Sequence, residues 1–239
     1  MDAPSRFLKL KNEMKELAHK EVSILIVSFV MIFGIWLFIL ISEAVVHGST
    51  KSFDEWVLTA LRDMKKEGMP IGPVWLEEAM IDITALGGGT VMFLITAIVV
   101  LFLILKKEYQ SMWFVLAATI GGTLLSFWLK ELIGRDRPTV VIHLLKVTSL
   151  SFPSGHSMMS AVVYLTQASL LARIESVRRI KIYIISVALF LSFIIGFSRV
   201  YLGVHYPTDV IGGWAVGSAW ACLCWMIART IQKRKKVNS

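Results

Sequence analysis

Six stretches of the chain contain no Asp, Glu, Lys or Arg, and each is long enough to cross a membrane as a helix. A helix needs about 20 apolar residues to span a bilayer core of ~30 Å, with roughly 17 to 25 tolerated. The hydrophobic fraction of 56% and the mean hydropathy of +0.68 exceed those of soluble domains. We therefore predict an all-α, polytopic membrane protein with six transmembrane helices in one bundle. The predicted spans are Val22–Ser42, Ile83–Leu105, Tyr109–Leu129, Ser154–Ala172, Ile182–Ser198 and Val210–Ala228.

The chain contains no low-complexity linker and no internal repeat that would mark a domain boundary. We predict one integral membrane domain over residues 1–239. Within it, residues 1–21 would form a cytoplasmic N-terminal segment and residues 43–82 an outer loop, while the polar motifs occupy residues 130–209.

Residues 43–82 form the longest connection between the apolar stretches. Ser52 and Glu55 have the spacing of a capping box, which predicts the start of a helix. Apolar side chains such as Phe53 and Trp56 then recur at helical spacing, while the charged residues lie mainly on the other faces. We predict a short amphipathic helix, or more than one, in this first outer loop, lying flat at the outer interface. Such a helix either shapes the entrance for a lipid or only anchors the segment.

Lys and Arg residues cluster at both ends of the chain and in two of the predicted loops. Cytoplasmic loops collect these residues, so both termini are expected in the cytoplasm of a multi-pass cell-membrane protein. Topology and contact with anionic lipids account for the net charge of +8, and no nucleic-acid partner needs to be assumed. The clusters comprise Arg6, Lys9, Lys11, Lys15, Lys20, Lys106, Lys107, Arg173, Arg178, Arg179, Lys181, Arg229, Lys233, Arg234, Lys235 and Lys236.

Four basic residues fall on the opposite, outer side in this topology: Arg135, Arg137, Lys146 and Arg199. Snorkelling or contact with lipid headgroups would explain any one of them alone. Three of them, however, belong to short polar segments that interrupt the apolar chain at 130–138, 153–156 and 198–209. Together these segments indicate a phosphate-handling site at the edge of a membrane.

The first polar segment contains Lys130 and, seven residues later, Arg137 followed by Pro138. An Arg guanidinium offers two parallel donors that match phosphate oxygens, and Lys adds a mobile point charge. Both residues would suit a phosphoryl group. Arg135 either joins them or simply faces water.

The second segment, Pro153-Ser154-Gly155-His156, directly precedes an apolar stretch and has the features of a helix start. Ser154 can cap the helix, and Gly155 lets a ligand approach the backbone. Free N–H groups at a helix N-terminus bind anions, and His156 beside them could donate or accept a proton. Taken alone, the tripeptide fits a structural cap equally well.

In the third segment, His205 and Asp209 stand four residues apart around a Tyr206-Pro207 corner, six residues after Arg199. An Asp that holds one ring nitrogen of His205 would fix its tautomer and leave the other nitrogen free to attack phosphorus. A lone His and Asp would usually be structural.

The motifs Lys130-x6-Arg137-Pro138, Pro153-Ser154-Gly155-His156 and Ser198-Arg199-x5-His205-x3-Asp209 occur in this order. On these residues the chain resembles the type 2 phosphatidic acid phosphatase superfamily. That superfamily includes bacterial phosphatidylglycerophosphate phosphatases, undecaprenyl pyrophosphate phosphatases and, more remotely, soluble acid phosphatases and vanadium haloperoxidases. The motifs cover residues 130–209, and the six-span plan extends the likeness to most of the chain.

The resemblance implies that His205 is a nucleophile that forms a transient phosphohistidine and that Asp209 orients it. It implies that His156 protonates the leaving oxygen and then activates water. The residues implied to hold the phosphoryl oxygens are Lys130, Arg137, Ser154, Gly155 and Arg199.

Phosphoryl transfer requires mainly positioning and stabilisation of negative charge. Three cations and a helix N-terminus could supply both, and no dense carboxylate cluster accompanies the motifs, so we expect neither a metal nor a cofactor. The resemblance to short bacterial members favours phosphatidylglycerophosphate as the lipid substrate, with undecaprenyl pyrophosphate or phosphatidic acid as alternatives.

An anion or lipid transporter is the competing class of function. Transporter charges usually line the membrane midplane, whereas these residues lie at the ends of the spans on one side. The location of the charges therefore favours the phosphatase. The sequence leaves the oligomeric state open.

Overall fold

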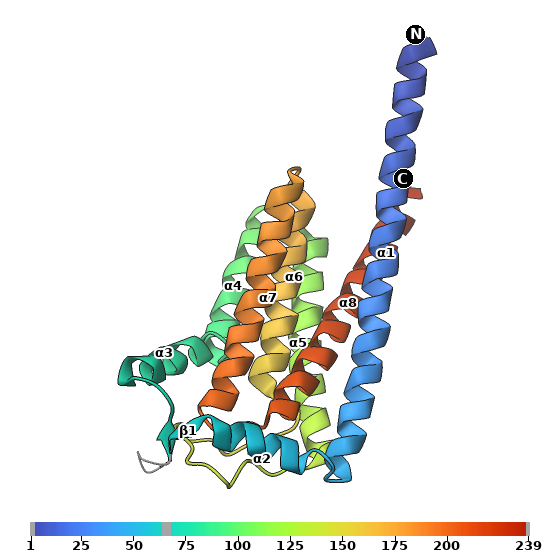
Figure 1. The fold of residues 1–239 in the computed structure, drawn as a ribbon. Coiled ribbons are helices and arrows are strands. Elements are labelled where there is room, and N and C mark those ends of the chain that lie inside the picture. Colours follow the sequence, from blue (N-terminus) through green and yellow to red (C-terminus); the bar gives the residue numbers. More distant parts are fainter. Residues whose placement is uncertain (1–2, 64–67, 238–239) are drawn as a thin grey trace.

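A computed structural model describes residues 3–63 and 68–237, and the described part of the chain is mainly helical. Its long helices stand roughly parallel, and one shorter helix lies across one end of the bundle (Figure 1). The helices are α1 Ala3–Val46, α2 Lys51–Ala60, α3 Val74–Ala85, α4 Gly89–Leu105, α5 Tyr109–Ile133, α6 Gly155–Ile174, α7 Arg178–Tyr201 and α8 Pro207–Val237.

Helix α8 lies between α1 and the rest of the bundle (Figure 1). Small residues allow α1 to approach it closely, because a side chain at Gly34 would meet the carbonyl oxygen of Ala215 at 2.7 Å. On its other side α8 presents Gly217, where a side chain would lie 2.5 Å from the carbonyl oxygen of Met158 in α6. Glycines thus fix the spacing of three neighbouring helices.

Helix α6 occupies the centre of the bundle and contacts α5, α7 and α8. Its buried side chains include several polar ones, among them Ser157, Ser160 and Thr166. Ser160 shares a hydrogen bond of 3.0 Å with Ser192 of α7. A helix enclosed by other helices does not need an apolar surface toward lipid, which explains its polar composition.

The described residues contain four helices that are long and apolar enough to span a membrane: α1, α5, α7 and α8. The pair α3 and α4 passes the same test as one span bent by 47°, which gives up to five. Helix α6, the fourth predicted span, is not among them. An integral membrane fold is therefore supported, whereas the expected count of six spans is not established.

The second predicted span was misplaced at its start. We expected one helix over Ile83–Leu105, but residues 83–85 belong to α3, and α4 begins only at Gly89. The chain bends at residues 86–88, where Leu86, Gly87 and Gly88 donate their backbone N–H groups to Ile83, Thr84 and Ala85. The absence of charge does not reveal such a break, because the charge-free residues continue through the bend.

The segment 43–82 includes the end of α1, the whole of α2, most of α3 and two short strands. Strand β1, Arg62–Asp63, pairs antiparallel with β2, Met69–Pro70. The predicted amphipathic helix corresponds to α2, but its N-cap is Thr50 without a side-chain cap bond, so the capping box expected at Ser52 does not form. On α2, Asp54 and Leu58 face the protein and are buried.

Candidate active site

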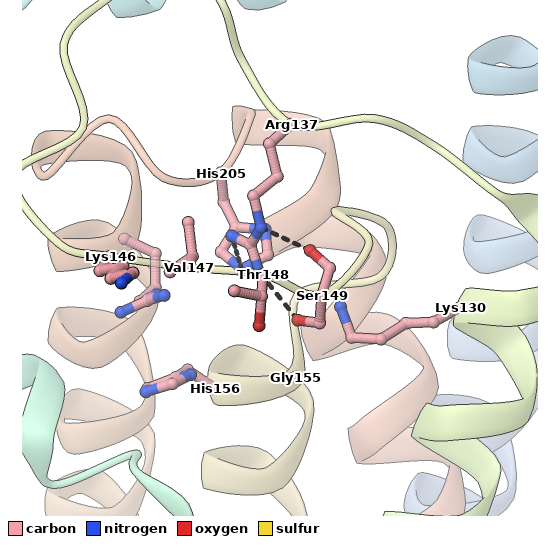
Figure 2. Close-up of a pocket in the computed structure, with 10 residues that line it drawn as sticks. Lys130, Arg137, Lys146, Val147, Thr148, Ser149, Gly155, His156 and His205 are labelled. Carbon is pink, nitrogen blue, oxygen red and sulfur yellow. Dashed lines mark hydrogen bonds between the residues drawn. The ribbon is translucent and has the colours of Figure 1, made fainter.

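A cavity of about 260 Å³ opens at the end of the bundle that α2 crosses. The loops 134–154 and 202–206 meet there with the ends of α5, α6 and α7 (Figure 2). Residues from all three polar segments of the sequence lie in its wall. The lining residues are Lys130, Arg137, Lys146, Val147, Thr148, Ser149, Gly155, His156, Arg199 and His205.

Three of the predicted cations enter the cavity from three different elements. Lys130 lies in the last turn of α5, Arg137 in the loop after it and Arg199 in the last turn of α7. The Lys130 ammonium donates to the carbonyl oxygen of Leu150 at 2.6 Å. Arg199 donates from one terminal nitrogen to the hydroxyl of Thr84 at 3.0 Å.

Arg137 is held mainly by backbone oxygens. Its Nε donates to the carbonyl of Ser149 at 2.6 Å and a terminal nitrogen donates to the carbonyl of Val204 at 2.6 Å. Burial lowers the pKa of Arg137, partly offset by Asp209. Within the described chain, none of the three cations has a carboxylate within ion-pairing distance. The cavity therefore concentrates positive charge that its own residues do not neutralise, as an anion site requires.

His205 lies on the short loop between α7 and α8 and is only 1% exposed. Gly203 allows this loop to turn, because it has a φ of +76° and a side chain there would lie 2.5 Å from the Arg62 guanidinium. The ring nitrogen Nε2 of His205 lies 3.3 Å from an Arg137 nitrogen at the cavity wall (Figure 2). The other nitrogen, Nδ1, lies 3.3 Å from Asp209 Oδ2.

The surroundings of His205 disfavour its protonated form. Burial lowers its pKa well below 6.5, and the positive charges of Arg199, Arg137 and Lys130 lower it further, followed by His156. A proton on Nδ1 facing Asp209 would leave the lone pair on Nε2, which lies 3.3 Å from the Arg137 nitrogen. The role of His205 as a nucleophile stays a prediction.

Asp209 is fully buried and holds the start of α8 together with the His205 loop. Its Oδ2 accepts bonds from the Ser151 hydroxyl at 2.5 Å and from the backbone N–H of Tyr206 at 2.9 Å. The second of these bonds is the back-bond of a capping box, with Pro207 at the first helical position. The local sequence at the corner thus explains why His205 and Asp209 meet.

The start of α6 forms the base of the cavity. Ser154 caps this helix, accepting hydrogen bonds from the backbone N–H of Ser157 at 3.4 Å and from the Ser157 hydroxyl at 3.0 Å. Gly155 and His156 line the cavity, whereas Ser154 is fully buried and does not. The structure thus places Ser154 beneath the site, where its side chain supports the helix. A contact between Ser154 and phosphate stays a prediction.

Sequence reasoning did not identify the partners of Arg135. This side chain neither joins the phosphate-facing cations nor faces water, because it bridges Asp209 Oδ1 at 2.6 Å and Asp54 Oδ2 at 2.7 Å. Asp54 is one of the charged residues that the helical pattern predicts mainly on faces other than the apolar one. The spacing of charges along α2 could not show that this carboxylate meets residues 81 and 154 positions later.

Groups of three or more His, Cys, Asp or Glu side chains that could hold a metal ion do not occur among the residues with a described structure. The two cysteines, Cys222 and Cys224, are free and lie within α8.

The motif order, the cavity and the helical frame now allow a comparison with known proteins. Residues 111–233 match the PAP2 superfamily. The chain belongs to this superfamily. It is 36% identical to phosphatidylglycerophosphatase B of Bacillus subtilis (strain 168) over 191 residues, which cover 77% of this chain and 88% of the relative.

Two solved structures and a second curated relative are also similar to this chain, each to a different extent. The crystal structure of the transmembrane PAP2 type phosphatidylglycerolphosphate phosphatase from Bacillus subtilis matches with a TM-score of 0.75 and 30% identity, covering 83% of this chain and 97% of that one. Aquifex aeolicus LpxE matches with a TM-score of 0.51 and 26% identity, covering 66% and 88%. An undecaprenyl-diphosphatase of Sulfolobus acidocaldarius is 35% identical over 80 residues, 30% of this chain and 31% of that protein. This PAP2 chain is therefore an integral membrane phosphatase, in the class of lipid phosphatases to which these relatives belong.

Proposed function

We propose that the protein hydrolyses the phosphomonoester of a membrane lipid through a phosphohistidine on His205, without a metal ion, with phosphatidylglycerophosphate as the favoured substrate. The observation that carries this proposal is that one cavity brings together the buried His205, a second histidine and three cations without carboxylate partners among the described residues. The likeness to phosphatidylglycerophosphatase B supports the choice of lipid.

In the first step, Nε2 of His205 attacks phosphorus and the bond to the lipid oxygen breaks. Lys130, Arg137 and Arg199 stabilise the charge that spreads over the phosphoryl oxygens. Asp209 accepts the Nδ1 proton of His205 in a hydrogen bond and stabilises the ring as it becomes positive. His156 must enter this step protonated, a state that the negative charge of the bound phosphate favours, and it donates that proton to the leaving oxygen.

In the second step, His156 takes a proton from water, which attacks the phosphohistidine and releases inorganic phosphate. The backbone at Gly155, at the start of α6, lies at the cavity wall and adds the positive end of a helix dipole. Every charge required is thus supplied by side chains and backbone of this chain.

The proposed topology has six spans, with α6 as the enclosed span and both termini in the cytoplasm. The active site then faces the outer side of the cell membrane. The substrate tail would remain among the spans while the headgroup reaches the cavity, so no soluble carrier is needed.

A second candidate substrate is an isoprenoid pyrophosphate such as undecaprenyl pyrophosphate. Lys146 lines the same cavity and adds a fourth cation, which a second phosphate group could use. The partial match to an undecaprenyl-diphosphatase supports this alternative.

The test measures phosphate release by purified protein in detergent and excess chelator, with equal concentrations of phosphatidylglycerophosphate, phosphatidic acid and undecaprenyl pyrophosphate. We expect the highest kcat/KM for the first lipid. His205→Ala should lower kcat by at least about 10⁴-fold, because the nucleophile is lost, and His156→Ala by at least about 10²-fold. Near-native turnover of His205→Ala would refute the mechanism, and a strict Mg²⁺ requirement would refute its metal independence.

A further inference from the structure

Asp54 and Asp209 are the two carboxylates buried in the described part of the chain, and each is 0% exposed. Burial of an ionised carboxylate is costly unless it is paired and hydrogen-bonded. Asp209 holds the His205 loop, which explains its position. Asp54 lies on α2, outside the lining of the cavity, and the phosphatase mechanism does not use it.

Asp54 contacts the start of α8 directly. Its Oδ1 accepts a bond from the backbone N–H of Thr208 at 3.1 Å, and its Oδ2 accepts one from the Thr208 hydroxyl at 2.7 Å. Thr208 immediately precedes Asp209 and lies in the first turn of α8, where backbone N–H groups lack partners within the helix. A carboxylate from α2 therefore fixes the turn that carries Asp209.

Arg135 joins the two carboxylates. One terminal nitrogen donates to Asp209 Oδ1 at 2.6 Å and the other donates to Asp54 Oδ2 at 2.7 Å. The guanidinium also lies over the ring of Tyr206, 4.1 Å from its centroid. Burial lowers the pKa of Arg135, but the two carboxylates outweigh this effect and raise it above its usual value, so the bridge stays charged.

The bridge determines which oxygen of Asp209 remains for His205. Arg135 occupies Oδ1 with one nitrogen, and Oδ2 receives Ser151, Tyr206 and the Nδ1 side of His205. An Arg side chain prefers to bind a carboxylate with two parallel bonds. By holding the second nitrogen, Asp54 keeps Arg135 from taking both oxygens of Asp209.

We propose that Asp54 is a positioning residue for the nucleophile His205, acting through Arg135 and Asp209, and that α2 is therefore part of the active-site framework. This inference rests on the proposed function, because it assigns Asp54 a role in the attack by His205. The residue touches neither the cavity nor the substrate site, so its effect must pass through the other two.

The charges around His205 come from every element packed against it. Lys130 faces it from α5, Arg137 from the loop, His156 from α6, Arg199 from α7 and Asp209 from α8. The negative charge of Asp54, on α2, is linked to this group through its ion pair with Arg135, which also pairs with Asp209. Backbone oxygens or Thr84 hold the three phosphate-facing cations, so loss of Asp54 leaves their contacts in place.

The experiment compares Asp54→Asn with Glu55→Gln in phosphate release on phosphatidylglycerophosphate. Both changes remove one negative charge from neighbouring positions of α2, but Glu55 pairs only with exposed Lys51 at 3.9 Å. We expect Asp54→Asn to lower kcat by at least about tenfold, because small misplacements of a reacting group are costly. KM should stay within about threefold, and Glu55→Gln should match the wild type. Arg135→Lys, which keeps the charge but lacks the two separate terminal nitrogens that bind Asp209 and Asp54, should also lower kcat.

A double-variant cycle separates positioning from a general structural effect. If Asp54 acts through Asp209, adding Asp54→Asn to the Asp209→Asn variant should slow single-turnover phosphate release by less than about twofold. The reason is that Asp209→Asn alone already removes the connection from Asp54 to His205. Rates are normalised to protein that elutes as a monodisperse detergent peak. Three outcomes would each overturn the proposal. The Asp54→Asn variant could have the kcat of the wild type, or the two changes could have additive effects on the rate in the double variant. The third outcome is that neither Asp54→Asn nor Arg135→Lys yields folded protein. Failure of the proposed function itself would appear separately, as activity that survives His205→Ala.

Discussion

At the scale of single residues, the site depends on a contrast between two sets of basic side chains. Lys130, Arg137 and Arg199 lie at the cavity with backbone or hydroxyl partners, so their charge is available to an anion. Arg135 stands only two positions before Arg137 but is committed to two carboxylates. Neighbouring arginines in one polar segment therefore have different tasks: one faces the cavity and the other supports Asp209.

The buried state of His205 predicts a loss of stability in acid. Its folded-state pKa is lowered, by burial first and by Arg199 second, whereas the unfolded chain takes up a proton near pH 6.5. Its contribution to stability is present above that pH and is lost as the pH falls below it, by up to about 1.4 kcal/mol per pH unit. We expect the thermal midpoint in detergent, followed by tryptophan fluorescence, to fall between pH 7 and pH 5.

A matched pair of variants isolates the contribution of this histidine. His205→Gln should show a weaker fall of the midpoint over the same pH range, because no buried imidazole has to be protonated on unfolding. His47→Gln, at an exposed position, should retain the wild-type pH dependence. If the thermal midpoints of the His205→Gln variant and the wild type fell equally with pH, His205 would not be the source of the acid sensitivity.

At the scale of elements, the break between α3 and α4 lies against the catalytic face of the bundle. A side chain at Gly87 would lie 2.5 Å from Ile195 Cγ2 and 3.3 Å from His156 Cδ2. The same turn receives a hydrogen bond of 3.1 Å from the Tyr164 hydroxyl to the Leu86 carbonyl. The bend in the chain therefore provides part of the wall against which His156 packs.

Gly87→Ala should disturb this wall. The added methyl group must displace Ile195 or the His156 ring, and overpacking of this kind costs typically about 1–3 kcal/mol. We expect a lower thermal midpoint together with a fall in kcat of about tenfold, since His156 is the proposed acid and base. Gly89→Ala is the control in the same turn, because a side chain there meets nothing within 4 Å. Equal behaviour of the two variants would show that the break does not support His156.

At the scale of the whole molecule, the described helices have their catalytic loops at one end and both chain termini toward the other (Figure 1). Helix α2 and the loop 134–154 cover the catalytic end. The basic cluster at 106–107 lies between α4 and α5, and the cluster at 173–181 lies at the end of α6 and the start of α7. The two ends of the bundle thus differ in function as well as in charge.

The proposed topology predicts that Thr148→Cys reacts with a membrane-impermeant thiol reagent added to intact cells. Thr148 is exposed at the cavity wall, so its replacement should be accessible from outside. Lys106 follows the last residue of α4, at the end of the bundle opposite the catalytic loops, so Lys106→Cys should react only after the membrane is permeabilised. The native cysteines are replaced by alanine in both variants. If only the Lys106→Cys variant were labelled in intact cells, the protein would have the opposite orientation to the one proposed.

Several features could be predicted from the sequence because they depend on local order. The charge-free stretches indicated the membrane helices, and the motif spacing brought His205 and Asp209 to one corner, where a capping box and Pro207 begin α8. The start of α6 at Gly155 was also predictable, because Ser154 is a good N-cap and its hydroxyl performs that task.

Only the tertiary structure decided how these local features combine. It bent the second predicted span at residues 86–88, enclosed α6, and brought Asp54 of α2 to Arg135 and Thr208. No rule of spacing could reveal the contacts of Asp54, because they join residues far apart in sequence and depend on how whole helices pack. The sequence by itself determined which side chains could hold a phosphate and which segments could enter a membrane. The fold determined which cations line the cavity without a carboxylate partner and that Arg135 instead binds Asp54 and Asp209.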